Sequence, residues 1–328
     1  MRPLEPIPLE AVRAAAARIA GSAIRTPLVR MEDSETAREI WLKLENLQPI
    51  GSFKLRGALN AMALASTESL ARGVYTASAG NMAQGVAWSA RRLGVRCRVI
   101  VPERAATVKL RAIERLGGEI IRVPFDEWWQ TIIRHSYPGM EGLFIHPVSD
   151  PAVIAGNGTI GLEILEDLPQ VDAVVVPYGG GGLSCGIASV CRALSPKTRV
   201  IACEVSTAAP FSASLRTGTA TSVEYAPSFV DGIGGKSVLA EMWPLARELL
   251  TTAVVVSPSQ IAEAVRLLAE HNRVVAEGAG AAAVAAARSG EAGNGRIVCI
   301  VSGGNIDAAV LAAILRGELP GSAPPRTD

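Results

Sequence analysis

Short runs of β-branched and other apolar residues alternate with amphipathic stretches from about residue 95 onward. This alternation is typical of strands joined by crossover helices in a parallel sheet. Because nearly every position in the runs is apolar, helices are expected to cover both faces of the sheet. The predicted strands are CRVIV at 97–101, EIIRV at 119–123, DAVVVP at 172–177, RVIACEV at 199–205, AVVVS at 253–257 and IVCIVS at 297–302.

The segment from Ser259 onward predicts an amphipathic helix. Ile261, Ala264, Val265 and Leu268 follow the spacing that places apolar residues on one helix face. The chain of 328 residues is too long for one small core, so we expect an α/β protein with open parallel sheets flanked by helices and two interleaved lobes. Ligands bind such sheets at the carboxyl ends of the strands, which makes the loops there the first places to search.

Composition and charge exclude several classes of protein. The formal net charge is +1 and no basic stripe is interleaved with aromatic residues, so nucleic acid is not an expected partner. The first ten residues contain two glutamates and three prolines, and no apolar run reaches the ~18 residues of a membrane span, so neither a signal peptide nor a membrane partner is expected. The cysteines are odd in number and lack CxxC spacing, which favours a reducing, cytoplasmic location; they are Cys97, Cys185, Cys191, Cys203 and Cys299.

The first candidate segment is GSFKLRGA at 51–58, where Lys54 follows a Gly-Ser turn and opens a predicted helix. The positive end of that helix is expected to lower the pKa of the Lys54 amine, as an amine that attacks an aldehyde requires. Alternatively, Lys54 and Arg56 are ordinary surface charges in the first turn of a helix.

The other lysines narrow this choice. The chain has five lysines, and Lys43, Lys109 and Lys197 lie in a strand, an amphipathic helix and a turn, where solvated ions are expected. Only Lys54 and Lys236 lie in glycine-rich loops. Lys236 belongs to a GKS sequence without the upstream glycine of a Walker motif, so ATP hydrolysis is not expected.

The second segment is a glycine run between a predicted strand and a predicted helix. Backbone N–H groups of such a run surround a phosphate, and the following helix N-terminus favours its charge. A tight turn explains the same run without a ligand, whereas a dinucleotide fingerprint does not fit, because its third glycine would be a serine or a cysteine. The run consists of Gly179, Gly180, Gly181, Gly182 and Leu183.

The third segment is TASAGNMAQG at 76–85, again a predicted strand, turn and helix. Its hydroxyl, backbone N–H groups and side-chain amide suit a carboxylate and a phenolic oxygen, although helix capping is the favoured explanation of this segment in isolation. The residues concerned are Ser78, Ala79, Gly80 and Asn81.

The fourth segment is IVSGGN at 300–305, which places Ser302 at the end of a buried strand. The Ser302 hydroxyl suits a hydrogen bond to a pyridine nitrogen, and an ordinary turn stabilised by serine explains it as well.

In this order the four motifs resemble those of the fold type II pyridoxal-phosphate enzymes, in particular the threonine dehydratase and serine racemase family, from about Thr26 to Leu315. The resemblance implies a two-lobed, tryptophan synthase β-like architecture. A large cofactor-binding domain would comprise residues 1–47 and 148–328, and a small mobile domain would comprise 48–147. It also implies pyridoxal 5′-phosphate as the cofactor, a small amino acid as the substrate, and a homodimer.

The resemblance assigns a role to each motif. Lys54 would hold the cofactor as a Schiff base, Phe53 would pack against its ring, and the GGGGL loop would hold its phosphate. Asn81 would contact the phenolic oxygen and Ser302 the pyridine nitrogen. Glu277, in VVAEGAG, matches an acidic position near the ring.

The reaction implied is the conversion of a β-hydroxy amino acid, threonine or serine, to the 2-oxo acid and ammonia. Lys54 would remove the α-proton, and the β-hydroxyl would leave as water. A buried substrate carboxylate needs hydrogen-bonding partners, which the turn from Ser78 to Asn81 provides.

Two departures from the family pattern concern the reaction. Serine racemases have a second acid/base, a serine, where this chain has Ala79, so racemisation should be poor. Metal-dependent relatives use a glutamate matching Glu204, a carbonyl near Ala208 and an aspartate where this chain has Pro210. Because proline offers no side-chain oxygen, no metal site is expected.

Several alternatives remain open at this stage. In one alternative, the substrate is another β-hydroxy amino acid such as 3-hydroxyaspartate. In another, the reaction is a β-replacement on the same fold. A non-catalytic ligand-binding α/β protein is a further possibility, because such folds host many functions. Asp231, in FVDGIGG, would polarise a substrate hydroxyl or cap a turn.

Overall fold

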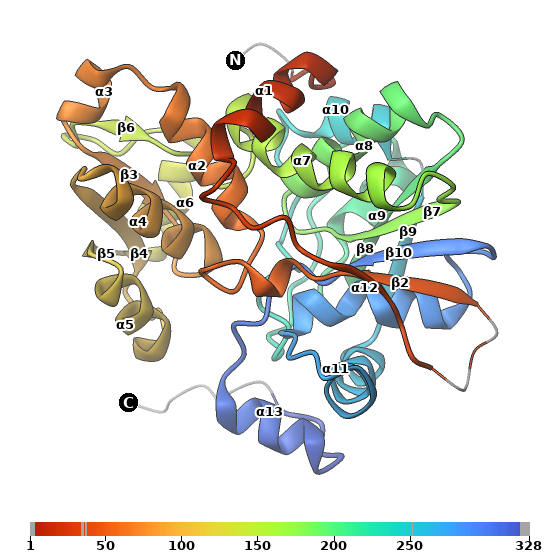
Figure 1. Cartoon of the computed structure of the whole chain (residues 1–328). Helices are drawn as coiled ribbons and strands as arrows, with labels where there is room; N and C mark the ends of the chain where they lie inside the picture. The colour runs from red at the N-terminus through yellow and green to blue at the C-terminus, as the bar shows by residue number, and fades with distance from the viewer. Residues whose placement is uncertain (1–3, 34–35, 37, 251, 322–328) are drawn as a thin grey trace.

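The computed structural model describes residues 4–33, 36, 38–250 and 252–321 and builds them around two sheets (Figure 1). The larger sheet has six strands, and all its neighbouring pairs are parallel except β1 with β2. Its strands, in spatial order, are β1 (Leu28–Arg30), β2 (Glu39–Lys43), β10 (Arg296–Ile300), β7 (Ala173–Pro177), β8 (Arg199–Val205) and β9 (Ala253–Val256).

Helices cover both faces of the larger sheet, as the continuous apolarity of its strands predicts. Val174 and Val176 of β7 pack into the core formed with α7 (Pro151–Asp167) and α8 (Gly182–Leu194). Val175 packs into the opposite core, formed with α11 (Pro258–Asn272) and α12 (Gly278–Ser289). The predicted α/β class is confirmed, and α11 is the helix predicted from Ser259 onward.

The smaller sheet contains four parallel strands, β5 (Gly118–Val123), β4 (Cys97–Pro102), β3 (Val74–Ala77) and β6 (Leu143–Phe144). Alternate residues of β4 face two cores: Val99 meets α4 (Asn81–Leu93) and α5 (Thr107–Arg115), whereas Ile100 faces the core shared with α6 (Phe125–Arg134). Where the chain divides into domains, and whether the smaller part moves, remain predictions.

Helix α2 (Lys54–Leu64) lies between the two sheets and packs against α4 and α7 (Figure 1). Gly57 and Gly156 allow this approach, since a Cβ atom on Gly156 would lie 2.5 Å from the Arg56 carbonyl oxygen. The remaining elements are α1 (Leu9–Ile19), the 3-10 helix η1 (Glu45–Leu47), α3 (Thr67–Ala71), α9 (Pro210–Thr217), α10 (Trp243–Leu249) and α13 (Ala308–Leu315).

A buried ionic network fixes the first turn of α2. Arg56 donates to Glu45 on η1 at 2.8 Å and to Glu163 on α7 at 2.6 Å, and Lys43 at the end of β2 donates to Glu163 at 2.6 Å. The expectation that Lys43 is solvated was therefore wrong, as was the alternative that Arg56 is a surface charge: Lys43 is 0% exposed and Arg56 1%. Opposite charges on neighbouring segments explain both burials.

Among the residues that the structure describes, no helix combines the length and apolarity needed to cross a membrane.

Candidate active site

Lys54 begins α2 and points its amine toward the segment that follows β6. Its Nζ donates to the Pro147 carbonyl oxygen at 2.8 Å and lies 5.2 Å from the centre of the Phe53 ring. Burial lowers the pKa of Lys54 to about 8, because the charged form loses its solvation. The predicted direction of the shift agrees with the structure, but its main cause is burial rather than the helix N-terminus. A substantial neutral fraction of the amine near pH 8 suits a nucleophile and a base.

The GGGGL loop joins β7 to α8. Gly181 has a φ of +95°, a left-handed conformation that favours glycine, and α8 begins at Gly182 without a side-chain cap. Its first backbone N–H groups are therefore free to bind an anion, and the helix dipole favours one there. The donor set fits the phosphate of a cofactor.

Two of the loop glycines are required by close packing. A Cβ atom on Gly180 would lie 2.5 Å from Val148 Cγ2, and one on Gly182 would lie 2.7 Å from the Val148 carbonyl oxygen. Because the Pro147 carbonyl oxygen accepts a hydrogen bond from the Lys54 amine, adjacent residues of one turn contact both the lysine and the glycine loop. Nothing in the sequence motifs singled out this turn.

The Asn81 side chain is held between two partners at the start of α4. Its Nδ2 donates to Glu277 Oε1 at 2.8 Å, and its Oδ1 accepts from Asn305 Nδ2 at 2.8 Å. Asn305 is the last residue of the IVSGGN segment, and no sequence signal indicated that it would be the second partner of Asn81. The two bonds orient the amide and bring the third and fourth motifs together.

The turn before α4 is open to a ligand on one side. A Cβ atom on Gly80 would have no neighbour within 4 Å, and the Gly80 N–H donates to Ser78 Oγ at 3.2 Å. Ala79 is partly buried against the core of the smaller sheet. The turn is therefore capped locally by Ser78, and the space beside Gly80 is open.

Ser302 lies two residues after the end of β10, and its carbonyl oxygen accepts the N–H of Phe53 at 3.0 Å. This bond joins the fourth motif to the first, next to Lys54. The Ser302 side chain is buried, and its contact with a cofactor ring stays a prediction.

Glu277 occupies the N-cap position of α12, where its side chain forms no capping hydrogen bond, and it is buried beside Asn81. Burial raises the pKa of Glu277 to about 7, and the negative charge of Asp231 contributes to the rise. The folded protein thus binds a proton at Glu277 more tightly than the unfolded chain does. This contribution to stability is complete below pH 4.5 and is lost as the pH rises through about 7.

Glu277→Gln is therefore expected to raise the free energy of unfolding of the cofactor-free protein at pH 8 by about 1–3 kcal/mol, because an uncharged amide replaces a buried anion. Near pH 4.5 the two proteins should be equally stable. Urea unfolding of both proteins at the two pH values measures the difference. An equal difference at both pH values would mean that charge at Glu277 is not its origin.

Asp231 has a partner that neither sequence-based interpretation included. Its carboxylate forms an ion pair with Lys109 of α5, so the pair connects the loop after α9 to the smaller sheet. Asp231 is half exposed and lies near Glu277, whose pKa it affects. The charge of Asp231 is thus already neutralised on one side by Lys109.

Glu204, the predicted counterpart of a metal ligand, binds a helix instead. Its two carboxylate oxygens accept the N–H groups of Phe211 and Ser212 at 2.8 and 2.7 Å, in the first turn of α9. Pro210 occupies the first position of that helix. The Glu204 carboxylate therefore stabilises the positive end of α9.

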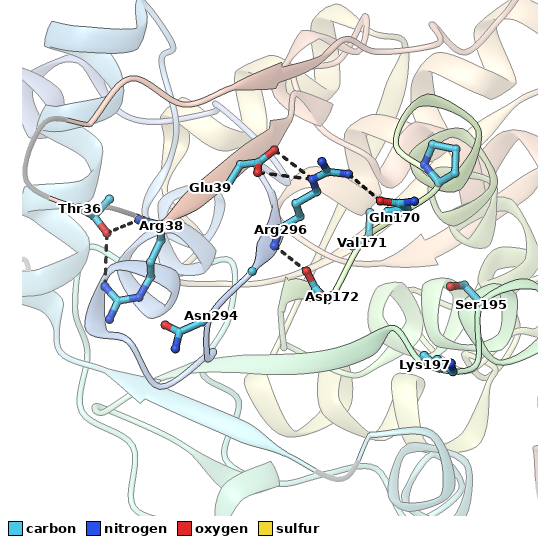
Figure 2. Close-up of a pocket in the computed structure, with 12 residues that line it drawn as sticks. Thr36, Arg38, Glu39, Gln170, Val171, Asp172, Ser195, Lys197, Asn294 and Arg296 are labelled. Carbon is cyan, nitrogen blue, oxygen red and sulfur yellow. Dashed lines mark hydrogen bonds and ion pairs between the residues drawn. The ribbon is translucent and has the colours of Figure 1, made fainter.

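A separate hollow of about 920 Å³ lies at the opposite edge of the larger sheet, where β2 and β10 begin (Figure 2). Arg296 donates there to Asp172, Glu39 and Gln170. Ligands of parallel sheets bind at the other edge, and these charges pair with one another, so we assign no site to this hollow.

The motifs thus meet at the carboxyl ends of the parallel strands, where the turn at 147–149 contacts both a partly buried lysine and a glycine loop whose donors suit an anion. This arrangement defines a class of α/β enzymes that hold a phosphorylated aldehyde cofactor on a lysine.

Comparisons with known proteins identify the family. A family model described as pyridoxal-phosphate dependent enzyme matches residues 19–303. The L-threonine ammonia-lyase of Thermotoga maritima is 43% identical over 287 residues, which cover 87% of this chain and 71% of that protein. The catabolic L-threonine dehydratase of Escherichia coli K12 is 39% identical over 310 residues, covering 92% and 94%.

Solved structures agree with this result. Maize serine racemase superposes with a TM-score of 0.87 at 30% identity, covering 95% of this chain and 98% of that one. The processed form of threonine deaminase isoform 2 from Solanum lycopersicum has a TM-score of 0.82 at 31% identity, covering 96% of each chain. The chain therefore belongs to the pyridoxal-phosphate-dependent enzymes of fold type II, and pyridoxal phosphate is its cofactor.

Proposed function

We propose that this protein is an ammonia-lyase that converts L-threonine, and serine to a lesser extent, to the 2-oxo acid and ammonia. The observation that carries the proposal is the placement of Lys54: its amine donates to Pro147, whose neighbour Val148 packs on the glycine loop, and relatives 39–43% identical are threonine ammonia-lyases or dehydratases. Pyridoxal phosphate, when bound, delocalises the electron pair that remains after an α-proton is removed.

The residues of the site divide the remaining work. The N–H groups of Gly179 to Leu183 hold the phosphate, and Phe53 and Ser302 contact the ring and its nitrogen. Asn81, oriented by Glu277 and Asn305, faces the phenolic oxygen. This assignment rests on where the motifs meet and on the donors they offer.

Lys54 acts as the base that takes the α-proton, and the turn from Ser78 to Asn81 binds the substrate carboxylate. The lowered pKa of Lys54, about 8, keeps part of the amine neutral and able to accept that proton. The β-hydroxyl takes up a proton and leaves as water. The released enamine is then hydrolysed to the 2-oxo acid and ammonia. Ala79 has only a methyl group, which cannot return a proton to the α-carbon from the face opposite Lys54. Elimination is therefore favoured over racemisation.

The proposal extends to the protein's surroundings. All five cysteines are buried and unpaired, which supports a reducing, cytoplasmic location. We infer a homodimer from the family resemblance. The division into a large domain (1–47 and 148–328) and a small mobile domain (48–147) is also part of the proposal, supported by the two separate sheets. No divalent cation is included, because Glu204 binds the start of α9.

Product analysis with four substrates tests the assigned reaction. We expect 2-oxobutanoate and ammonia in equal amounts from threonine, and slower formation of pyruvate from serine. Faster turnover of 3-hydroxyaspartate would replace the proposed substrate. Formation of cysteine from O-acetylserine and sulfide, without turnover of threonine, would instead establish a β-replacement enzyme.

A further inference from the structure

His146 is a buried histidine outside the motifs, in the turn between β6 and α7. Its side chain is 1% exposed, and its Nδ1 accepts the backbone N–H of Val148 at 3.1 Å and that of Ser149 at 2.7 Å. The imidazole thus does for residues 147–149 what a capping side chain does for a helix end: it satisfies two buried N–H groups and fixes the path of the chain.

Successive residues of this turn contact the two halves of the cofactor site. The Pro147 carbonyl oxygen accepts the Lys54 amine at 2.8 Å. The Val148 side chain and carbonyl press against the phosphate loop, leaving no room for a Cβ atom on Gly180 or Gly182. A shift of the turn would therefore move the acceptor of the lysine and the support of the loop together.

The protonation state of His146 suits this role. Its Nε2 lies 3.2 Å from the Ile132 carbonyl oxygen and donates to it, which leaves Nδ1 as the acceptor. Burial lowers the pKa of His146 to about 3, so Nδ1 remains an acceptor at neutral pH.

The neighbouring His135 and Glu241 give the same region the composition of a metal site. A metal would need a free lone pair on His146, and both ring nitrogens already have partners. The His135 ring stacks on His146 with 4.1 Å between centroids, and its Nε2 contacts the side chains of Glu241 and Ser149 rather than the backbone of the turn. The hydrogen bonds therefore favour a structural use of the His146 imidazole over metal binding.

We propose that His146 is a positioning residue whose Nδ1 holds the 147–149 turn, so that Pro147 faces the Lys54 amine and Val148 supports the phosphate loop. The inference rests on the cofactor of the family being bound at that loop. It predicts that loss of the His146 Nδ1 acceptor weakens cofactor binding more than loss of the Nε2 donor does.

Two polar substitutions separate the two nitrogens. Asparagine places an acceptor where Nδ1 lies, whereas glutamine places its amide where Nε2 lies and leaves the two turn N–H groups without an acceptor. We expect His146→Asn to bind pyridoxal phosphate within about threefold of the wild type and His146→Gln to bind it about 10–100-fold more weakly, as the loss of one or two buried hydrogen bonds implies. The affinity is measured by titrating the cofactor-free proteins and following visible absorbance.

The control is His135→Asn, which removes the stacked ring but leaves both backbone hydrogen bonds of the turn in place, and it is expected to bind the cofactor as the wild type does. Equal affinities for His146→Asn and His146→Gln would overturn the inference, and so would a greater loss with asparagine. If the wild type itself bound no cofactor, the family assignment of the site would fail instead. If His146→Gln does not fold, the inference stands or falls on His146→Asn, which must retain both wild-type affinity and wild-type kcat.

Discussion

Lys54→Ala is expected to lose turnover of threonine by a factor of at least about 10²–10⁴, the usual contribution of a positioned base. The loss should be larger still, because the same amine holds the cofactor. The reason is local: the Lys54 amine lies against the Phe53 ring and donates to the Pro147 carbonyl oxygen, and alanine offers no group to replace it. The measurement is the rate of 2-oxobutanoate formation together with the visible absorbance of the bound cofactor.

Lys236→Ala is the matched control, because Lys236 is the other lysine of a glycine-rich loop and is exposed. Its rate and absorbance should equal those of the wild type. A Lys54→Ala protein with near wild-type turnover would contradict the assignment of Lys54 as the catalytic lysine. Loss of turnover in Lys236→Ala alone would assign that role to Lys236. Far-UV circular dichroism of both variants separates a lost amine from a lost fold.

Arg56→Met is expected to lower the free energy of unfolding by about 3–5 kcal/mol, because it leaves buried carboxylates without their principal cation. Arg56 donates to both Glu45 and Glu163, and the charge of Arg56 lowers the pKa of the Glu45 carboxyl against the opposing effect of burial. Arg56→Lys should recover only part of the loss, since an ammonium group cannot form the same paired bonds. Urea unfolding of the three proteins gives the comparison.

The control for charge alone is Arg96→Met, which removes an exposed ion pair with Glu119 and should leave the unfolding curve nearly unchanged. A comparable decrease in the free energy of unfolding in both variants would show that the effect of Arg56 on stability does not depend on the burial of its ion pairs. Arg56 lies in the same helical turn as Lys54. Under conditions in which the Arg56→Met protein folds, we therefore expect it to bind the cofactor more weakly than the wild type does.

The parts of the fold that the sequence predicted are those fixed by local pattern. All six predicted strands are present with ends within two residues, because runs such as 199–205 are apolar at nearly every position. The short strands β1 and β6 were not predicted, since three and two residues are too few to show a period.

The four motifs also lie together in the structure, because loops at the carboxyl ends of parallel strands meet in space; their roles in the site stay predictions. What they did not predict depends on partners distant in sequence. Lys43 is buried because Glu163 on another helix pairs with it, and Asp231 is paired because Lys109 beside the smaller sheet reaches it. No local signal distinguishes either residue from a solvated charge.

The roles of backbone groups in the site could not be predicted from the sequence either. The acceptor of the Lys54 amine is a carbonyl of Pro147, and every residue type offers a carbonyl. The same holds for His146, whose two donors are backbone N–H groups. Such positioning becomes visible only when the turn that carries these groups has been located.

The most direct test of the central claim is the visible absorbance spectrum of the purified holoprotein, recorded before and after threonine is added, with 2-oxobutanoate assayed in the same sample. The account predicts an absorbance band that is absent from Lys54→Ala, that changes on mixing with threonine, and that is accompanied by 2-oxobutanoate from the wild type alone. A stable band with no 2-oxobutanoate would contradict the proposed substrate, and the absence of any band after incubation with pyridoxal phosphate would contradict the site itself.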